Sequence, residues 1–511
     1  MGRVKRDGGS MNADPEEACS PTDFALFRMR SSLSLLLLLC LLPRLFADDP
    51  PNIVFMLADD QSWGGTSVAM HPDFEFSRSR IVQTPSLEKL AAQGMRFSSA
   101  YAPAPVCSPT RCSLQLGISP AQTGWTKAAP VMEASNGYRL IPPQVGKSLS
   151  KGTTTIAELL RNAGYATAHY GKWHLNGSGP SEHGYDDSDG ATSNEYAYRF
   201  QDPNPVDIFG MADRAARFMK KNSEIGKPFY IQLSWHALHA PENALKSTIA
   251  KYQRLTNGRG ASGVAIAEDL DTGVGRVMEA IDRLGLADRT YVIYMSDNGG
   301  GGRSSQLRGG KGSVYEGGIR SPLIVRGPGV LANSWCHTPV VGYDFFPTFC
   351  QWAGMKVSRL PRGIEGGSLA SILANGGSGD VIRPRPELVF HFPHYQSTDG
   401  PQTAMIFGQM KLMKFYDSDR VALFDLSTDI QERNDLATQR PEETQQLHDR
   451  LQSYLASVGA KIPQLNPEFD PKNQPSLIQR GPPQGGKEKS RKRESSRQRR
   501  KLGKPKRDRN D

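Results

Sequence analysis

Short apolar runs without polar alternation recur through the first two thirds of this chain. The first is Asn52–Ala58 (NIVFMLA), and the later ones are Tyr165–Tyr170, Phe229–Ser234, Tyr291–Ser296 and Pro322–Arg326. Runs of this kind are typical of strands that are buried on both faces of a parallel sheet. A chain that contains several of them must cover both faces of that sheet with other elements.

Helical patterns lie between these runs. Thr84-Pro85 has the residue types of an N-cap and a first helical position, and Thr155-x-x-Glu158 is a capping box for a helix over 156–163. Val264–Leu284 carries an apolar period that is typical of a helix. Strands that alternate with helices predict an α/β fold with a mostly parallel central sheet sandwiched by helices.

The pattern changes after about Asn375. Short antiparallel strands and a closing helix are expected there, at Glu387–Phe392, Thr403–Phe407, Lys411–Phe415, Val421–Asp425 and Glu442–Val458. We therefore expect a first domain over 48–375 and a smaller C-terminal antiparallel-sheet subdomain over 376–473. The remaining residues, 474–511, have the composition of a disordered basic tail.

Residues 1–47 predict a targeting segment in front of the folded domain. Leu33–Leu42 is an almost unbroken apolar run that follows Arg28 and Arg30. Its length is about half of a membrane span but matches the apolar region of a secretory signal peptide. We expect cleavage near Ala47, an exported protein that is periplasmic or secreted, and no transmembrane span in the mature chain. An uncleaved membrane anchor is the alternative.

The charge of the chain is unevenly distributed. The chain has 62 Lys and Arg against 52 Asp and Glu, a formal net charge of +10. Residues 480–511 carry +10 and residues 48–479 carry −1. A nucleic-acid-binding domain needs a basic stripe on its folded surface, so nucleic acid is not an expected partner. The basic run Lys487–Arg509 is either a solvated tail or a tether to polyanions.

Two of the predicted strands end in carboxylate and amide side chains. Asp59-Asp60 follows the first run, and Asp297-Asn298 follows Tyr291–Ser296. In an open parallel sheet, functional residues gather at the carboxyl ends of the strands. Three carboxylates would repel one another there unless a cation lay between them, and all-oxygen ligands favour Ca²⁺ or Mg²⁺ over zinc. The alternative is that each pair only caps the following turn or helix.

Basic side chains follow the other predicted strands. They are Lys172 and His174 after the Tyr165 run, His236 and His239 after the Phe229 run, Lys311 in a Gly-rich loop, and Arg111. Histidines transfer protons near neutral pH, and the lysines and the arginine could neutralise a tetrahedral oxyanion. Each alone could be a surface charge or a structural histidine. Together with the cation site, they predict a pocket for an anionic ester.

Cys107 lies in Pro105-Val-Cys-Ser-Pro-Thr-Arg111. This Cys-x-Pro-x-Arg motif resembles the sequence that the formylglycine-generating enzyme recognises in type I sulfatases. It lies about 47 residues after the Asp-Asp pair and precedes G-K-W-H, an H-A-P segment and S-D-N-G in the order of that family. The resemblance covers roughly Asn52–Ala437. It implies an arylsulfatase-like, formylglycine-dependent enzyme of the alkaline phosphatase superfamily, with the α/β sandwich and the C-terminal subdomain of that fold.

The resemblance also implies a role for each matching residue. The ligands of one Ca²⁺ would be Asp59, Asp60, Asp297 and Asn298, together with the formylglycine (3-oxoalanine) made from Cys107. The other catalytic residues would be Arg111, Lys172, His174, His239 and Lys311, of which Lys172 and Lys311 would also bind the substrate. His239 is preferred to His236 because His239-Ala240-Pro241 aligns with the H-x-P of the family.

The implied mechanism is nucleophilic. One hydroxyl of hydrated formylglycine attacks sulfur, and the other, once deprotonated, expels sulfate and regenerates the aldehyde. His239 would protonate the leaving alcohol, and His174 would take the proton that drives sulfate release.

Two positions depart from the family pattern. After the core motif the family has two apolar residues and Thr-Gly, whereas this chain has Leu114-Gln115-Leu116-Gly117. Because the maturation enzyme reads that flank, the efficiency of Cys107 conversion is in question. Asn176 replaces the usual Gly after Gly-Lys-Trp-His-Leu, in a predicted loop that should tolerate it.

The sequence leaves two other functions open. A phosphate or phosphonate monoester hydrolase of the same superfamily would share the sheet and the metal position, but would use a Ser or Thr nucleophile and often two zinc ions. A non-catalytic, sulfated-glycan-binding protein would keep only the scaffold.

The substrate expected from the resemblance is a sulfated small molecule or glycan. His394, in His391-Phe-Pro-His394-Tyr395, is expected to contact a sugar, and the alternative is a strand end with exposed aromatic residues. His183 is a weaker candidate. The expected partners are this substrate, the formylglycine-generating enzyme during maturation and, through the basic tail, a polyanion.

Overall fold

The computed structural model of the protein describes residues 49–128, 137–146, 148–258, 260–300 and 306–475. The chain divides into two units, Met1–Asp49 and Pro50–Asp511, and every helix and strand below belongs to the second unit. The predicted signal segment and the basic run Lys487–Arg509 lie outside the described residues. Within the described part of the chain, none of the helices has the length and apolar character needed to span a membrane.

An eight-stranded sheet forms the centre of this unit, with the strand order β10-β2-β9-β8-β1-β7-β5-β6. Its strands are β1 (Asn52–Ala58), β2 (Met95–Phe97), β5 (Ala166–Gly171), β6 (Asp187–Ser188), β7 (Phe229–Ser234), β8 (Thr290–Ser296), β9 (Leu323–Arg326) and β10 (Ser334–Cys336). Strands β8, β1, β7 and β5 are adjacent and parallel, and β9 runs antiparallel to both of its neighbours. The predicted, mostly parallel sheet is confirmed.

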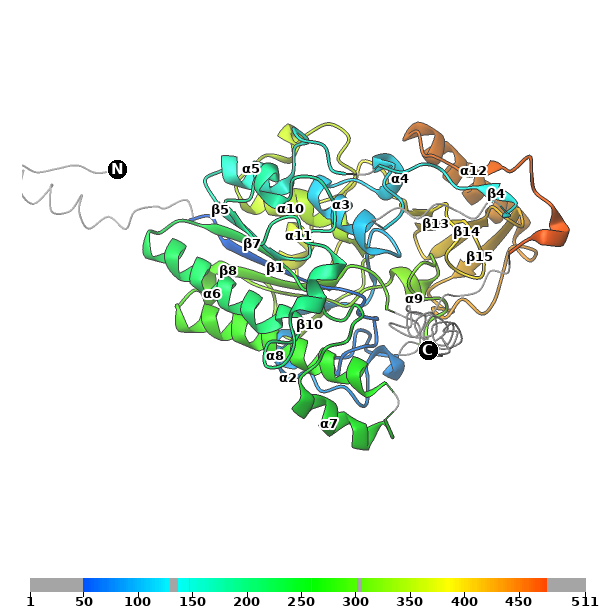
Figure 1. The fold of residues 1–511 in the computed structure, drawn as a ribbon. Helices are drawn as coiled ribbons and strands as arrows, with labels where there is room; N and C mark the ends of the chain where they lie inside the picture. The colour runs from blue at the N-terminus through cyan, green and yellow to red at the C-terminus, as the bar shows by residue number, and fades with distance from the viewer. Residues whose placement is uncertain (1–48, 129–136, 147, 259, 301–305, 476–511) are drawn as a thin grey trace, which may run out of the picture. The chain divides into compact units, whose positions relative to one another are not determined.

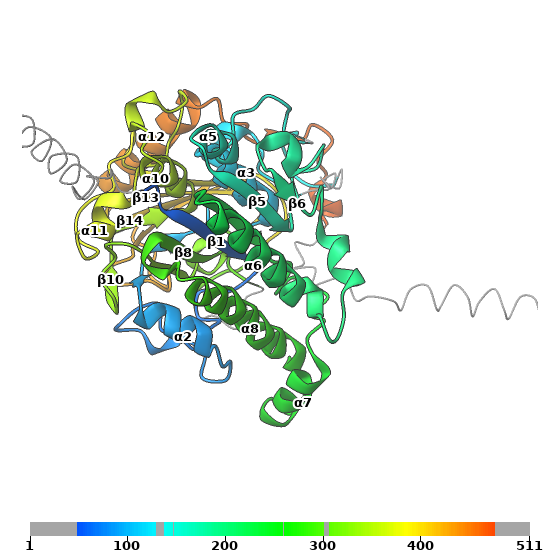
Figure 2. The ribbon, with the colours of Figure 1, turned by 90° about the vertical axis from the view of Figure 1, so that its left-hand side faces the viewer.

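Helices cover both faces of this sheet (Figures 1 and 2). Val54 and Met56 of β1 face one apolar core, which also contains residues of α2, α6 and α8, and Phe55 and Leu57 face a second core with residues of α5, α10 and α11. The helices of the unit are α2 (Pro85–Ala92), α3 (Cys107–Leu116), α4 (Pro120–Thr123), α5 (Ile156–Asn162), α6 (Ile208–Glu224), α7 (Lys246–Leu255), α8 (Ala261–Arg283), α9 (Glu316–Ile319), α10 (Phe345–Trp352), α11 (Ala370–Ala374) and α12 (Pro441–Ser457). Successive side chains of β1 point to opposite faces of the sheet, so an entirely apolar strand needs helices on both faces.

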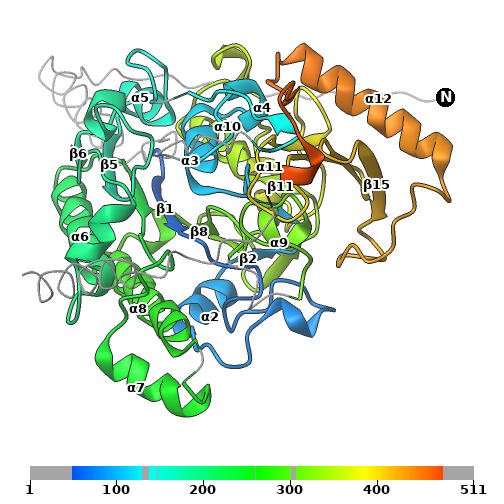
Figure 3. The ribbon, with the colours of Figure 1, turned by 45° about the vertical axis from the view of Figure 1, so that its right-hand side comes forward.

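A second, antiparallel sheet follows the helix α11. It is formed by β12 (Leu388–Phe392), β13 (Gln402–Phe407), β14 (Met410–Phe415) and β15 (Arg420–Asp425) in chain order. The helix α12 packs on one face of it through Leu447, Leu451 and Tyr454 (Figure 3). The other face packs on residues that include Val106, directly before Cys107. The predicted antiparallel region therefore adjoins the Cys107 segment.

The amino end of α2 differs from its prediction. Thr84 occupies the N-cap position, but its side chain makes no capping bond and its Oγ1 instead accepts a hydrogen bond from the N–H of Ser67. Asp271 of α8 caps the helix, because its carboxylate oxygens accept bonds from the N–H groups of Ser86 (2.9 Å) and Leu87 (2.8 Å). A cap supplied from a distant helix has no signal in the local sequence.

We expect Asp271→Ala to lower the free energy of unfolding by about 1–2 kcal/mol, because it leaves two helix N–H groups without an acceptor. Asp271→Asn keeps one acceptor oxygen, so its free energy of unfolding should fall by less. Urea denaturation of the two variants measures the difference. An Asp271→Ala protein as stable as the wild type would show that this cap does not contribute.

Candidate active site at the carboxyl ends of the central strands

Four adjacent strands bring the predicted site residues to one edge of the sheet. Asp59 and Asp60 follow β1, Lys172 and His174 follow β5, His236 and His239 follow β7, and Asp297 and Asn298 follow β8. Cys107 and Arg111 lie in the first turns of α3, and Lys311 lies in the loop between β8 and α9. Because β8, β1, β7 and β5 are neighbours and parallel, their carboxyl ends meet at one place.

An acidic cluster lies at the centre of this edge. One ligand atom from each of Asp59, Asp60, Cys107 and Asp297 lies within 4.8 Å of the others. The Cys107 thiol donates to Asp59 Oδ1 at 3.4 Å, and Asn298 Nδ2 lies 2.7 Å from Asp297 Oδ1 and 3.9 Å from Cys107 Sγ. The spacing places five polar side chains around one small volume, as the strand-end pattern predicts.

Three cations surround the carboxylates of this cluster. Arg111 Nη2 lies 2.6 Å from Asp297 Oδ2, Lys311 Nζ lies 2.6 Å from Asp60 Oδ2, and the ammonium of Lys172 contacts Asp59. Arg111 also donates to the backbone carbonyl of Lys172 at 2.7 Å, which fixes the guanidinium in place. The cations can therefore meet the oxygens of an anion that enters beside Cys107.

The carboxylates of the cluster differ in their acidity. Burial and the charge of Asp59 raise the pKa of Asp297 to about 7, although Arg111 opposes the shift. Burial also acts to raise the pKa of Asp59, but Lys172, His239 and Arg111 hold it well below its usual range. The raised value at Asp297 indicates that the positive charge around the cluster does not satisfy all of its carboxylates.

Burial and the neighbouring Asp59 raise the pKa of the Cys107 thiol to about 12. Unmodified Cys107 is therefore protonated at neutral pH in this environment. A protonated thiol is a weak nucleophile. The environment therefore disfavours a thiolate nucleophile at this position.

Two oxygens of the cluster are buried without a hydrogen-bond partner among the described residues. They are Asp60 Oδ1 and Asn298 Oδ1. Buried polar atoms rarely lack a partner, and each costs about 1–3 kcal/mol when it does. A hard cation bound by carboxylate and amide oxygens would satisfy both atoms and would separate the carboxylates. The donor set of this chain thus fits Ca²⁺ or Mg²⁺.

The histidines lie on the loops after β5 and β7. His174 is 2% exposed and has a φ of +55°, in the left-handed region. His236 is 3% exposed, and burial together with Lys172 lowers its pKa to about 3. His239 is only partly buried, and its Nδ1 lies 2.7 Å from the carbonyl oxygen of Ala240. Of the two histidines after β7, His239 is therefore the one with solvent access.

We expect His239→Ala to lower kcat/KM about 100-fold for a sulfate ester of an alkyl alcohol, because that leaving group needs a proton. The loss should be much smaller for p-nitrophenyl sulfate, whose leaving group is stable as an anion. His236→Ala should show no such dependence on the leaving group. Equal losses for both substrates in His239→Ala would contradict a role as proton donor.

The structure gives a physical account of both departures from the sulfatase pattern. Gln115, in place of an apolar residue, is buried, donates to Gln232 Oε1 at 2.8 Å and accepts from the Tyr185 hydroxyl at 3.0 Å. Asn176 has a φ of +53°, which Asn tolerates better than most residues. The fold thus accommodates both residues, whereas the effect of Gln115 on maturation stays a prediction.

His394 and His183 lie in buried positions. His394 is 4% exposed, and its Nε2 shares a 2.8 Å hydrogen bond with Thr126 Oγ1. Burial and the charge of Lys127 lower the pKa of His394 to about 2. His183 is 0% exposed and stacks on Trp173. Sugar contact by His394 stays a prediction, and the sequence reasoning missed Lys127, a basic residue in a loop with no motif around it.

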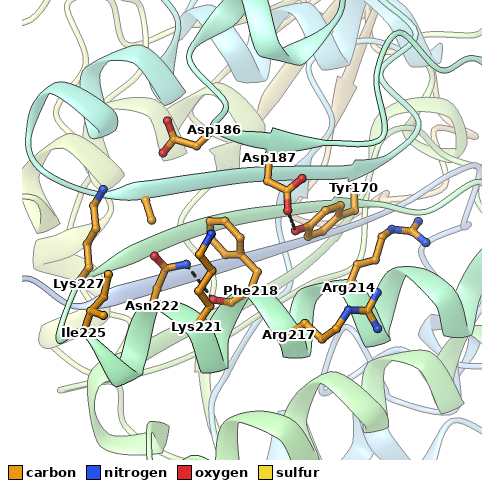
Figure 4. A pocket seen from close by; sticks show the side chains of 11 residues that line it. Tyr170, Asp186, Asp187, Arg214, Arg217, Phe218, Lys221, Asn222, Ile225 and Lys227 are labelled. Carbon is orange, nitrogen blue, oxygen red and sulfur yellow. Dashed lines mark hydrogen bonds between the residues drawn. The ribbon is translucent and has the colours of Figure 1, made fainter.

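A surface pocket lies elsewhere, between α6 and the strands β5 and β6 (Figure 4). Its charged lining is mixed, with Arg217, Lys221 and Lys227 beside Asp186 and Asp187. Figure 4 shows the Tyr170 hydroxyl bonded to Asp187 in this pocket. None of the predicted catalytic residues lines it, so it is separate from the strand-end site.

Comparisons with known proteins identify the family of the chain. The family model described as Sulfatase matches residues 51–355, and the model described as N-sulphoglucosamine sulphohydrolase, C-terminal, matches residues 310–461. Human arylsulfatase A is 30% identical over 406 residues, which cover 70% of this chain and 74% of the relative. The N-acetylgalactosamine-6-sulfatase of Sus scrofa is 30% identical over 369 residues, 65% of this chain and 67% of the relative.

A solved structure of a protein in complex with its substrate, D-glucosamine-2-N,6-O-disulfate, has the same fold. Its TM-score is 0.59 at 19% identity, and the match covers 80% of this chain and 98% of that chain.

The chain has the alkaline phosphatase-like fold, with the acidic cluster at the carboxyl ends of its central strands. The chain belongs to the sulfatase family, and it is an enzyme that hydrolyses sulfate esters. The resemblance inferred from Cys-x-Pro-x-Arg and its companion motifs is confirmed. The sulfatase relatives favour this activity over the two alternatives, a phosphate or phosphonate hydrolase and a non-catalytic binding protein.

Proposed function

We propose that this sulfatase releases sulfate from sulfated carbohydrates by means of a formylglycine made from Cys107 and one bound Ca²⁺. The observation that carries the proposal is the cluster of Asp59, Asp60, Cys107 and Asp297, whose ligand atoms lie within 4.8 Å of one another. The partnerless oxygens of Asp60 and Asn298 support a cation at the same place. The position of Cys107 at the amino end of α3 favours an anion there.

Each residue around Cys107 has a part in this proposal. Asp59, Asp60, Asp297 and Asn298 would hold the ion, which supplies Lewis-acid stabilisation of negative charge on sulfate oxygens. Formylglycine supplies, as its hydrate, one hydroxyl to attack sulfur and a second to release sulfate. The side chains that orient the sulfate group are Arg111, Lys172 and Lys311, and fixed cations of this kind stabilise charge that develops in the transition state.

His239 and His174 would move the protons. The partly exposed His239 can donate a proton to the leaving alcohol, and its position beside Asp59 keeps it next to the acidic cluster. His174, held on the loop after β5 by the bond from its N–H to the Thr192 carbonyl, would accept the proton that accompanies sulfate release.

The relatives support a substrate class for this proposal. One relative is an N-acetylgalactosamine-6-sulfatase, and the C-terminal family model is named for N-sulphoglucosamine sulphohydrolase. We infer sulfated amino sugars of the glycosaminoglycan type. The same proposal includes export through the N-terminal signal and maturation by a formylglycine-generating enzyme. It also includes the domain limits 48–375 and 376–473 and retention on polyanions through the tail.

The direct test co-expresses the chain with a formylglycine-generating enzyme. Mass analysis of the Cys107 peptide should show the aldehyde, which is lighter than cysteine by a characteristic amount. Sulfate release should then be measured on defined sulfated amino sugars. A converted enzyme that hydrolyses none of them would contradict the carbohydrate assignment, and activity with unconverted Cys107 would contradict the formylglycine assignment.

Removal of the cation should lower activity at least about 100-fold, because one fixed charge opposite the transition-state sulfate is lost. Dialysis against a chelator followed by addition of Ca²⁺ or Mg²⁺ measures the loss and its reversal. Thermal stability gives an independent readout, because an ion that binds only the folded state raises Tm.

Asp59→Asn should abolish the Ca²⁺-dependent rise in Tm, whereas Asp288→Asn, at an exposed position, should keep it. A Tm that does not respond to either cation in the wild type would contradict the metal site.

A further inference from the structure

Lys127 differs from the other buried or partly buried lysines around the site. Lys172, Lys311 and Lys411 each contact a carboxylate. Lys127 Nζ instead lies 3.4 Å from the backbone carbonyl oxygen of Tyr395, and none of the described carboxylates lies within ion-pair distance. Burial lowers the pKa of Lys127 to about 8. A partly desolvated ammonium with no counter-charge among the described residues is costly, and an anion bound beside it would reduce that cost.

The segment that Lys127 contacts borders the active site. Gln396 lies so close to Gly312 that a Cβ added to this glycine would lie 2.6 Å from Gln396 Nε2. Gly312 follows Lys311, and its N–H donates to the carbonyl of Pro105 at 2.8 Å. Pro105 lies two residues before Cys107. The 394–396 segment therefore adjoins the loops that carry both Lys311 and the Cys107 turn.

A second set of contacts joins Lys127 to the same region. Its ammonium lies 5.6 Å from the ring centroid of Phe392. Phe392 belongs to the apolar cluster that contains Val106, and Ala128, the residue after Lys127, packs against that cluster. Two contacts, to Tyr395 and to Phe392, thus place Lys127 at the segment that adjoins the Cys107 turn.

Hydrogen bonds of the neighbouring residues Trp125 and Thr126 fix the backbone at Lys127. The indole N–H of Trp125 donates to the carbonyl of Lys127 at 3.0 Å, and Trp125 is 4% exposed. The preceding residue, Thr126, is buried and bonded to His394. A cation on a fixed backbone loses less conformational freedom when it binds an anion than a cation on a mobile surface loop.

We propose that Lys127 binds a second anionic group of the substrate, a carboxylate or a sulfate beside the ester that is hydrolysed. This inference rests on the proposed function, because it assigns a substrate with two negative charges to the same site. His394 acts in it as a positioning residue, since its bond to Thr126 anchors the segment that presents Lys127.

The test compares substrates that differ by one anionic group. In N-acetyl-D-glucosamine 6-O-sulfate and D-glucosamine-2-N,6-O-disulfate, an anionic N-sulfate replaces a neutral N-acetyl group. N-acetyl-D-galactosamine 6-O-sulfate and the same sugar linked to a uronic acid differ by a carboxylate. The measured quantity is the ratio of kcat/KM for the doubly charged member to that for the singly charged member of each pair.

Lys127→Met should lower this ratio at least tenfold in the pair whose second anion reaches Lys127, and Lys127→Arg should restore it to within threefold. The control is Lys220→Met, at an exposed position on α6. Ratios within twofold of the wild type in both pairs would overturn the inference, as would an equal loss for all substrates. The pair that responds identifies the second group as sulfate or carboxylate.

A binding measurement separates this inference from the proposed function. In the Cys107→Ala background, calorimetry should show a tenfold weaker Kd for the doubly charged ligand when Lys127 is also changed to Met. If the converted wild type hydrolyses none of the four sugars, the proposed function fails, while this Kd still decides the role of Lys127. An unchanged Kd in that background overturns the inference.

Discussion

Cys107→Ala should lower kcat for sulfate release at least about 10⁵-fold, because it removes the residue from which the nucleophile is made. The fold should tolerate this change. Cys107 is 1% exposed, and among the described residues its thiol has polar contacts with Asp59 and Asn298, at 3.4 and 3.9 Å. The free energy of unfolding should therefore change by about 1 kcal/mol or less, since one sulfur atom and two weak contacts are lost.

Cys112 provides a matched control for this prediction. It lies in the same helix, is 2% exposed, carries a free thiol and belongs to the apolar core rather than to the acidic cluster. Cys112→Ala should keep kcat within about threefold of the wild type, because surface and core changes outside the site act mainly on stability. Residual activity above about 1% in purified Cys107→Ala would contradict the assignment of the nucleophile.

Five strands of the large sheet could be predicted because their residues are mostly apolar, whereas the short strands β2, β6 and β10 were not predicted. The predicted and observed limits of β7, Phe229–Ser234, are identical, and those of β8 and β9 differ by one residue. The helix α8 begins three residues before the predicted Val264, since Ala261-Ser262-Gly263 gives little apolar period. The convergence of Asp59 and Asp297 was also predictable, because the carboxyl ends of parallel strands share one edge.

Other parts of the site could not be predicted from the sequence. No local pattern shows that β1 lies between β7 and β8, so the pairing of Arg111 with Asp297 and of Lys172 with Asp59 is known only from the structure. The surroundings of Lys127 include Phe392 and Tyr395, which are distant in the chain. Sequence motifs identify which side chains carry chemistry, whereas the partners of each charge are set by packing.

A buried charge cluster joins the second sheet to the Lys311 loop. Lys411 Nζ of β14 lies 2.8 Å from Glu316 Oε1 and 2.8 Å from Glu432 Oε1, and Arg320 Nε lies 2.6 Å from Glu316 Oε2. The side chains of Lys411 and Glu316 are 0% exposed. Glu316 begins α9, five residues after Lys311. The cluster therefore fixes the loop that brings Lys311 to Asp60.

Lys411→Met should lower the free energy of unfolding by about 3–5 kcal/mol, because it leaves two buried carboxylates with one remaining cation. Lys411→Met/Glu432→Gln should recover part of this loss, since one of the repelling charges is also removed. Lys414→Met is the control, because Lys414 lies on the same strand and pairs with the exposed Asp419. That surface pair should contribute about 0–1 kcal/mol.

The pH dependence of the Lys411→Met loss tests its electrostatic origin. In the wild type, burial and Glu316 raise the pKa of Glu432 to about 7, against the opposing charge of Lys411. The folded wild type thus already binds a proton at Glu432 more tightly than the unfolded chain does, and removing Lys411 raises this pKa further. Stability then falls as the pH rises, and the loss should be smaller at pH 5 than at pH 8. Urea denaturation at pH 5 and at pH 8 measures the loss of stability. If this loss does not depend on pH and Glu432→Gln does not reduce it, packing rather than charge stabilises this junction.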